Sequence, residues 1–152
     1  MLQTIQPIRR NAKQAPAPKF VDPATIKERF YGLILAGHCL DPEFKHGDKM
    51  VIDKEGPLHV GCYAVFYYRP ELVPPGVLPM SLKRLVTAMP PVTLPYQEHP
   101  ESGVQFIIAV EQLNPPKRWV VRCADLLAVH RCLGRADDPA VKRRLEAERW
   151  RT

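Results

Sequence analysis

The sequence predicts a mainly β domain, and three observations lead to that prediction. Short segments rich in β-branched and aromatic residues recur along the chain, as expected of strands. Proline and glycine punctuate the chain between them, with 17 prolines among 152 residues. A helical pattern of any length occurs only at the C-terminal end. At this length we expect one domain with a sizeable core.

The first 21 residues are expected to form a flexible leader, because they are polar, contain prolines and show no periodicity. Asp22 is a candidate N-cap with Pro23 after it, which predicts a short helical turn that packs Ile26 and Phe30 onto the domain edge. A helix-turn-helix domain, a common DNA-binding unit, needs several tens of helical residues, and the 21-residue leader is too short to hold one. Sequence-specific DNA binding is therefore not expected.

The strands are expected where apolar and β-branched residues run between turn signals. Residues 70–79 and 90–100 are expected to be loops, because proline cannot donate a hydrogen bond in a strand ladder. Pro115 and Pro116 are expected to break the chain once more. The expected strand ranges are 31–36, 49–53, 62–68, 82–88, 104–110, 119–122 and 126–133.

Residues 135–152 are expected to form a basic helix and tail outside the β domain of residues 22–134. Asp138 followed by Pro139 is a typical helix start, and we expect the helix to reach Trp150. Its apolar stripe is thin, so the helix is expected to lie on the surface.

The formal charge of +6 is concentrated at the two ends of the chain. Residues 1–20 hold four basic and no acidic residues, and residues 135–152 hold six basic and four acidic ones, so residues 21–134 are balanced. Basic ends can contact nucleic acid, but solubilising ends are the commoner explanation. A nucleic-acid accessory bound through these ends is thus the weakest of the functional hypotheses.

The opening residues lack an apolar signal-peptide core, and no run approaches the roughly 20 apolar residues of a membrane span. The four cysteines then indicate free thiols in a reducing compartment. We expect a cytoplasmic protein that does not associate with a membrane. The cysteines show no C-x-x-C pairing, so we expect neither a metal nor another cofactor.

The stretch from Gly37 to Asp48 is the main candidate for a functional site. One strand is expected to end at Gly37, and the next to begin after Gly47 and Asp48. Glycine permits a tight turn, and Pro42 stiffens it. Cys39 is thereby presented at the tip of a rigid turn, where a nucleophile would be accessible.

This stretch resembles the LexA/signal-peptidase superfamily, whose peptidases use a serine–lysine pair. Four residues match the family's frame, and Cys39 stands where the family has its nucleophilic serine. Residues 82–86, Leu-Lys-Arg-Leu-Val, are similar to the family's Val-Lys-Arg-Ile strand, which implies a general-base position for Lys83. The resemblance covers residues 31–134 and implies a LexA/signal-peptidase-like β fold. The four frame residues are Gly37, Pro42, Gly47 and Asp48.

The resemblance implies that Cys39 and Lys83 form a catalytic pair. Burial of Lys83 would lower its pKa and favour the neutral base. The reference pKa of a thiol, about 8.5, lies below that of lysine, about 10.4, so the pair can also rest as thiolate and ammonium. Lys83 would then protonate the leaving amine. The alternative is that Cys39 is a small apolar plug in an inactive site.

Other groups of the turn have expected roles. Backbone N–H groups around Cys39 are expected to form an oxyanion hole, and Asp48 is expected to hold the turn by accepting backbone hydrogen bonds. His38 and His46 are outside candidates for the base.

These observations predict a stand-alone peptidase-like protein that acts on a peptide or protein substrate. The alternative is a catalytically inactive interaction module. Family members use this domain for dimerisation, and strands rich in valine, isoleucine and tyrosine can supply an edge or face for a homodimer.

Overall fold

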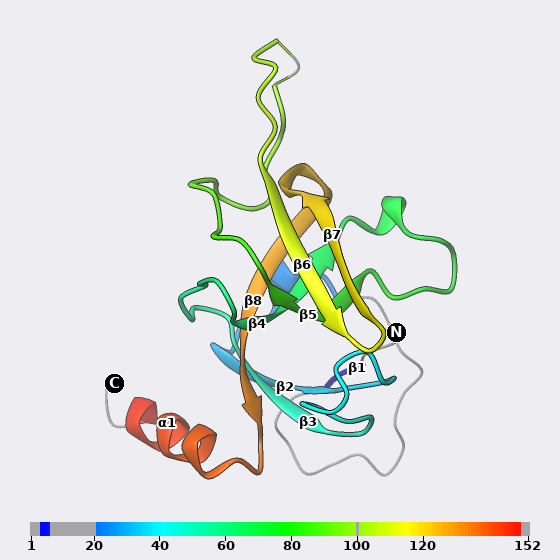
Figure 1. Cartoon of the computed structure of the whole chain (residues 1–152). Helices are drawn as coiled ribbons and strands as arrows, with labels where there is room; N and C mark the ends of the chain where they lie inside the picture. Colours follow the sequence, from blue (N-terminus) through cyan, green and yellow to red (C-terminus); the bar gives the residue numbers. More distant parts are fainter. Residues whose placement is uncertain (1–3, 7–20, 100, 150–152) are drawn as a thin grey trace.

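The computed structural model describes residues 4–6, 21–99 and 101–149. Within them the chain forms one antiparallel sheet of eight strands, one α-helix and three short 3-10 turns (Figure 1). The mainly β fold class predicted from the sequence is confirmed.

The strands are β1 (Thr4–Gln6), β2 (Phe30–Ile34), β3 (Lys49–Asp53), β4 (Tyr63–Tyr68), β5 (Met80–Leu85), β6 (Ile107–Leu113), β7 (Pro116–Arg122) and β8 (Leu126–Arg135). Their order in the sheet is β1-β2-β3-β8-β4-β5-β6-β7. The helix is α1 (Pro139–Arg149), and the 3-10 turns are Pro23–Thr25, Pro70–Leu72 and Cys123–Asp125.

The sheet is covered on both faces, which explains why β4 reads as a continuous apolar run. Val65 and Tyr67 belong to one core cluster, whereas Ala64 and Phe66 belong to a second one on the other face. β8 joins the two halves of the sheet, because it pairs with β3 on one side and with β4 on the other. Register shifts occur along both pairings, and such irregularities increase the local twist of a sheet.

The strand β1 differs from the expected unstructured leader. Thr4 pairs with Ile34 and Gln6 with Gly32, so this segment completes the edge of the sheet beside β2. Three residues are too few to show the alternation of apolar and polar side chains that predicts a strand. Their pairing depends on the free backbone N–H and C=O groups at the edge of β2, which the local sequence does not reveal. The rest of the predicted leader, residues 7–20 with their basic and proline residues, lies outside the described residues.

Several strand boundaries also differ from the prediction, and β5 spans Met80–Leu85 instead of 82–88. β6 occupies residues 107–113 instead of 104–110, and β7 begins at Pro116 rather than after the proline pair. Pro116 is accommodated because it is the first residue of a strand at the sheet edge. The β6–β7 hairpin is therefore longer than expected, and its turn at Asn114–Pro115 reaches the functional loop described below.

The two predicted helical segments are present. The Asp22 carboxylate accepts the Ala24 N–H at 2.9 Å and caps the first 3-10 turn. The carboxylate of Asp138 accepts the Ala140 N–H at 2.8 Å at the start of α1. The expected end of α1 at Trp150 lies outside the described residues. No helix in the described part of the chain has the length and apolarity needed to cross a bilayer.

Candidate functional site

The loop between β2 and β3 carries Cys39. β2 ends at Ile34, two residues before the end of the predicted range 31–36, and two backbone hydrogen bonds then close the base of the loop. Leu35 N–H donates to the Asp48 carbonyl at 2.9 Å, and Gly47 N–H donates to the Leu35 carbonyl at 2.7 Å. Gly37 and Gly47 adopt φ angles of 97° and 88°, a region that other L-residues rarely occupy.

Side chains hold this loop against the domain. Leu40 is fully buried, and Phe44 packs edge-on against Tyr63 with ring centroids 4.9 Å apart. Asp48 Oδ2 accepts the Lys45 N–H at 2.8 Å, which is the kind of backbone contact expected of it. Pro42, the remaining member of the sequence frame, is exposed.

The β6–β7 turn fixes the backbone at Cys39. The Cys39 carbonyl accepts hydrogen bonds from the N–H groups of Leu113, at 2.8 Å, and Asn114, at 2.9 Å. Asn114 Nδ2 also donates to the His38 carbonyl at 3.2 Å. Figure 1 shows the cyan loop after β2 lying beside the yellow turn of this hairpin. The position of Cys39 is thus set by a segment more than seventy residues further along the chain.

Lys83 is placed by β5, where it pairs with Ala64 of β4. Its side chain is almost entirely buried, with only 5% of the residue exposed. Nζ donates to Gln112 Oε1 at 3.5 Å and lies 5.6 Å from the ring centroid of Trp119. The Cys39 side chain lies close enough to this amine to influence its pKa.

Burial lowers the pKa of the Lys83 ammonium, because the charged form is poorly solvated there. The charge and hydrogen bond of Cys39 act in the opposite direction and offset part of this effect. Desolvation is the larger effect, so the pKa of Lys83 is lowered and the neutral fraction of its amine is increased. A neutral amine next to a thiol can accept its proton.

Three backbone N–H groups at and next to Cys39 have no acceptor in the described part of the protein. Within the described residues, the N–H groups of His38, Cys39 and Leu40 donate to no other group. Such N–H groups can stabilise the oxyanion of a tetrahedral intermediate.

Neither alternative base pairs with Cys39. His46 Nδ1 accepts the Gly37 N–H at 2.9 Å, and His38 Nδ1 lies 3.1 Å from Asp41 Oδ2. The His46 ring thus bonds to the loop backbone, and the His38 ring contacts an acidic side chain of the same loop.

Gln112, Asn114 and Trp119 were not among the predicted site residues. They belong to β6, β7 and the turn between them, and they reach the site only through the pairing of distant strands.

Cys39 is the half-buried member of the four free cysteines, and the other three are buried. Burial raises the pKa of Cys132 to about 12 and also raises that of Cys123. These two thiols are consequently poor nucleophiles. No group of three or more histidine, cysteine or acidic side chains in the described residues is arranged to hold a metal ion.

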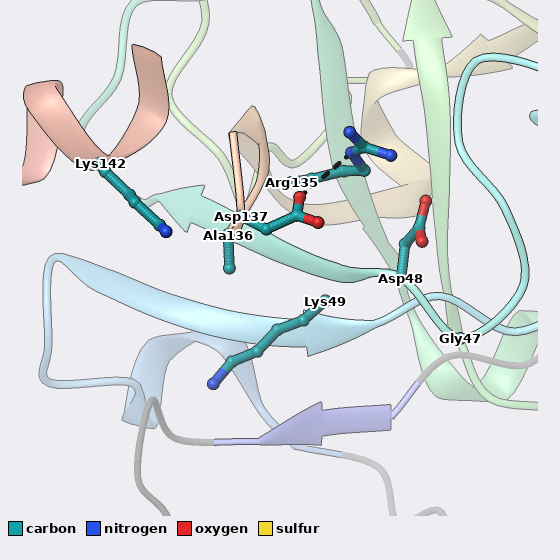
Figure 2. Close-up of a pocket in the computed structure, with 7 residues that line it drawn as sticks. All are labelled: Gly47, Asp48, Lys49, Arg135, Ala136, Asp137 and Lys142. Atoms are coloured by element: carbon teal, nitrogen blue, oxygen red, sulfur yellow. Dashed lines mark ion pairs between the residues drawn. The ribbon is translucent and has the colours of Figure 1, made fainter. Parts of the chain in front are cut away.

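A surface pocket of about 490 Å³ lies at the other end of the same loop, beside the start of α1 (Figure 2). Its charged groups come from Asp48, Lys49, Arg135, Asp137 and Lys142. In Figure 2 the carboxylate of Asp137 turns toward Arg135, with Oδ1 and Nε 3.3 Å apart. Cys39 and Lys83 do not line this pocket, so the paired thiol and amine form a separate site.

Comparison of the chain with protein-family models, with curated proteins and with solved structures finds no match.

Proposed function

We propose that this protein cleaves a peptide bond, with Cys39 as the nucleophile and Lys83 as the proton carrier. The observation that carries the proposal is the burial of Lys83 beside the Cys39 thiol, which acts on the pKa of the amine. The order of the Gly37, Cys39 and Lys83 segments, which resembles the serine–lysine peptidases, supports the same assignment.

In the proposed reaction the neutral Lys83 amine takes the proton of the Cys39 thiol, and the thiolate attacks the peptide carbonyl carbon. Backbone N–H groups around Cys39 bind the resulting oxyanion. The carbon–nitrogen bond then breaks, and the Lys83 ammonium gives its proton to the leaving amine, which leaves a thioester on Cys39. Lys83 next deprotonates a water molecule that hydrolyses the thioester, and the thiol is restored.

Free thiols are stable in a reducing compartment, and all four cysteines of the chain are free. We therefore place this activity in the cytoplasm, on a peptide or protein substrate.

The proposal is tested by incubating the protein with a complex peptide mixture and identifying cleavage sites by mass spectrometry. Wild type is expected to produce new termini. Cys39→Ala is expected to abolish them, and Lys83→Met to reduce them about a hundredfold, the usual contribution of a general base. Lys45→Met, which removes an exposed lysine from the same loop, is the matched control and should retain activity. Cleavage that survives Cys39→Ala or alkylation of Cys39 refutes the assignment.

A second candidate function is homodimerisation, and the outer hairpin favours it. β7 ends the sheet as described and pairs only with β6, so one side of its backbone is open. Ile107 and Val120 are 51% and 59% exposed on this hairpin. An exposed apolar edge of this kind can pair with a second copy. Light scattering of wild type and Val120→Lys tests it: a dimer that the substitution dissociates supports it, and a monomeric wild type excludes it.

A further inference from the structure

A second polar site lies where β8 meets the first 3-10 turn and the loop between β5 and β6. The pocket has a volume of about 370 Å³. It is separate from the Cys39–Lys83 site, since neither residue lines it. Its lining residues fall into a polar group, Asp22, Lys54 and His130, and an apolar group, Pro23, Ala24, Leu94, Pro95, Leu127 and Ala128.

His130 is the main polar group of this pocket, with only 6% of the residue exposed. Its Nδ1 lies 2.8 Å from the Tyr31 hydroxyl, which in turn lies 2.6 Å from the Tyr67 hydroxyl. No group among the described residues hydrogen-bonds to Nε2, although His130 lines the pocket. An imidazole nitrogen of a pocket-lining residue that has no partner in the protein is available to a ligand or to solvent.

The two hydrogen bonds allow two proton arrangements at His130. In one of them Tyr67 donates to Tyr31 and Tyr31 donates to Nδ1, so the neutral ring carries its proton on Nε2. In that arrangement Nε2–H is a hydrogen-bond donor without a partner among the described residues. Lys54 supplies a positive charge to the same pocket, and one of its protons is used by the Ile26 carbonyl at 2.7 Å, which leaves two donors.

These donors and the apolar walls define one kind of ligand. An acceptor with a single negative charge fits Lys54 and Nε2–H, and the walls fit a short branched or cyclic hydrocarbon. Asp22 also lines the pocket and disfavours a second negative charge, so phosphates and polycarboxylates are expected to bind less well.

We propose that this pocket binds a small apolar monocarboxylate, with the carboxylate held between His130 Nε2 and Lys54 Nζ. The same chemistry is offered by a free branched-chain acid and by the C-terminal carboxylate of a peptide that ends in an apolar residue. The site does not depend on the proposed peptidase activity.

The groups that face His130 support this assignment. Tyr31 and Tyr67 stay protonated because burial raises the pKa of both. Burial and the charge of Lys54 lower the pKa of His130 to about 4, and Asp53 opposes this change, so the ring is neutral in the free protein. A bound carboxylate adds a negative charge beside the ring and raises its pKa.

The test is an NMR titration of the full-length protein that follows the imidazole nitrogens of His130. Isovalerate represents the free acid, N-acetyl-leucine represents a peptide C-terminus, and isovaleramide is the uncharged control. We expect saturable shifts of His130 and a rise of its pKa with a carboxylate but not with the amide. The tighter of the two carboxylates identifies the source of the ligand.

Lys54→Met is expected to weaken carboxylate binding about tenfold, the effect of one charge-assisted hydrogen bond. Lys27→Met removes an exposed lysine near the same turn, which does not line the pocket, and should leave affinity unchanged. Leu94→Trp fills the pocket from a surface loop and should abolish binding in a protein that keeps its wild-type spectrum. Equal binding of acid and amide, no binding of either, or full affinity in both Lys54→Met and Leu94→Trp overturns the proposal.

Discussion

The Cys39 thiol lies close enough to the Lys83 amine to raise the pKa of that amine, although more than forty residues separate the two along the chain. Cys39 lies in the loop that connects β2 and β3, and Lys83 lies in β5, inside the sheet. The turn between β6 and β7 joins them, because its backbone binds Cys39 while Gln112 of the same hairpin binds Lys83. The proposed chemistry depends on this three-part arrangement.

Lys83→Met should stabilise the protein near neutral pH. The pKa of Lys83 is lower in the folded state than its ordinary value, so the unfolded chain binds more protons and burial of the amine costs stability. This cost is full below the folded pKa and decreases as pH rises toward about 10.4. Chemical denaturation at pH 7 should show a gain of about 1 kcal/mol for the variant, a typical cost of burying a polar group. A gain that increases with pH would contradict the sign.

His130 should make the protein sensitive to acid. Its pKa is about 4 in the folded protein and about 6.5 ordinarily, so the unfolded state takes up a proton first as pH falls. Stability should decline between about pH 6.5 and 4 by up to about 3 kcal/mol, since each pKa unit corresponds to about 1.4 kcal/mol. Denaturation curves across this range test the prediction. His130→Phe should remove this decline, whereas His99→Gln, at an exposed loop position, should retain it.

The ion pair between Arg29 and Asp53 should be a strong contributor to stability. Asp53 is fully buried, and Arg29 binds both of its carboxylate oxygens, at 3.0 and 3.1 Å. Arg29→Met leaves this buried charge poorly compensated and should cost about 3 kcal/mol in the free energy of unfolding. Arg29→Met combined with Asp53→Asn should recover part of the loss. Equal stability of Arg29→Met and wild type contradicts the assigned role.

Gly47→Ala should destabilise the loop of Cys39 through its backbone alone. Gly47 has a φ of +88°, and a Cβ at this position meets no atom within 4 Å. The strain should cost about 1 kcal/mol and slow the labelling of Cys39, because the base of the loop is altered. Gly76→Ala is the matched control: its φ is +81°, its Cβ is equally free, and it lies in a different loop. Equal labelling rates in the two variants would show that the turn does not position Cys39.

The sequence predicted the strands of the core well, because residues such as Val65 and Phe66 combine β propensity with burial on the two faces of the sheet. It also predicted the helix start at Asp138, where the capping signal is local. It did not predict β1 or the reach of the β6–β7 hairpin, since both depend on pairing with distant backbone. For the same reason Asn114 and the pocket around His130 have no signature in the sequence.

The most direct test of the central claim is the alkylation rate of Cys39 at pH 7.5, measured by mass spectrometry that resolves each cysteine. We expect Cys39 to react at least about tenfold faster than a free thiol and far faster than the buried Cys123 and Cys132. Lys83→Met should slow this reaction about tenfold, and Lys45→Met should not change it. A rate for Cys39 equal to that of an ordinary thiol and unaffected by Lys83→Met would contradict the account.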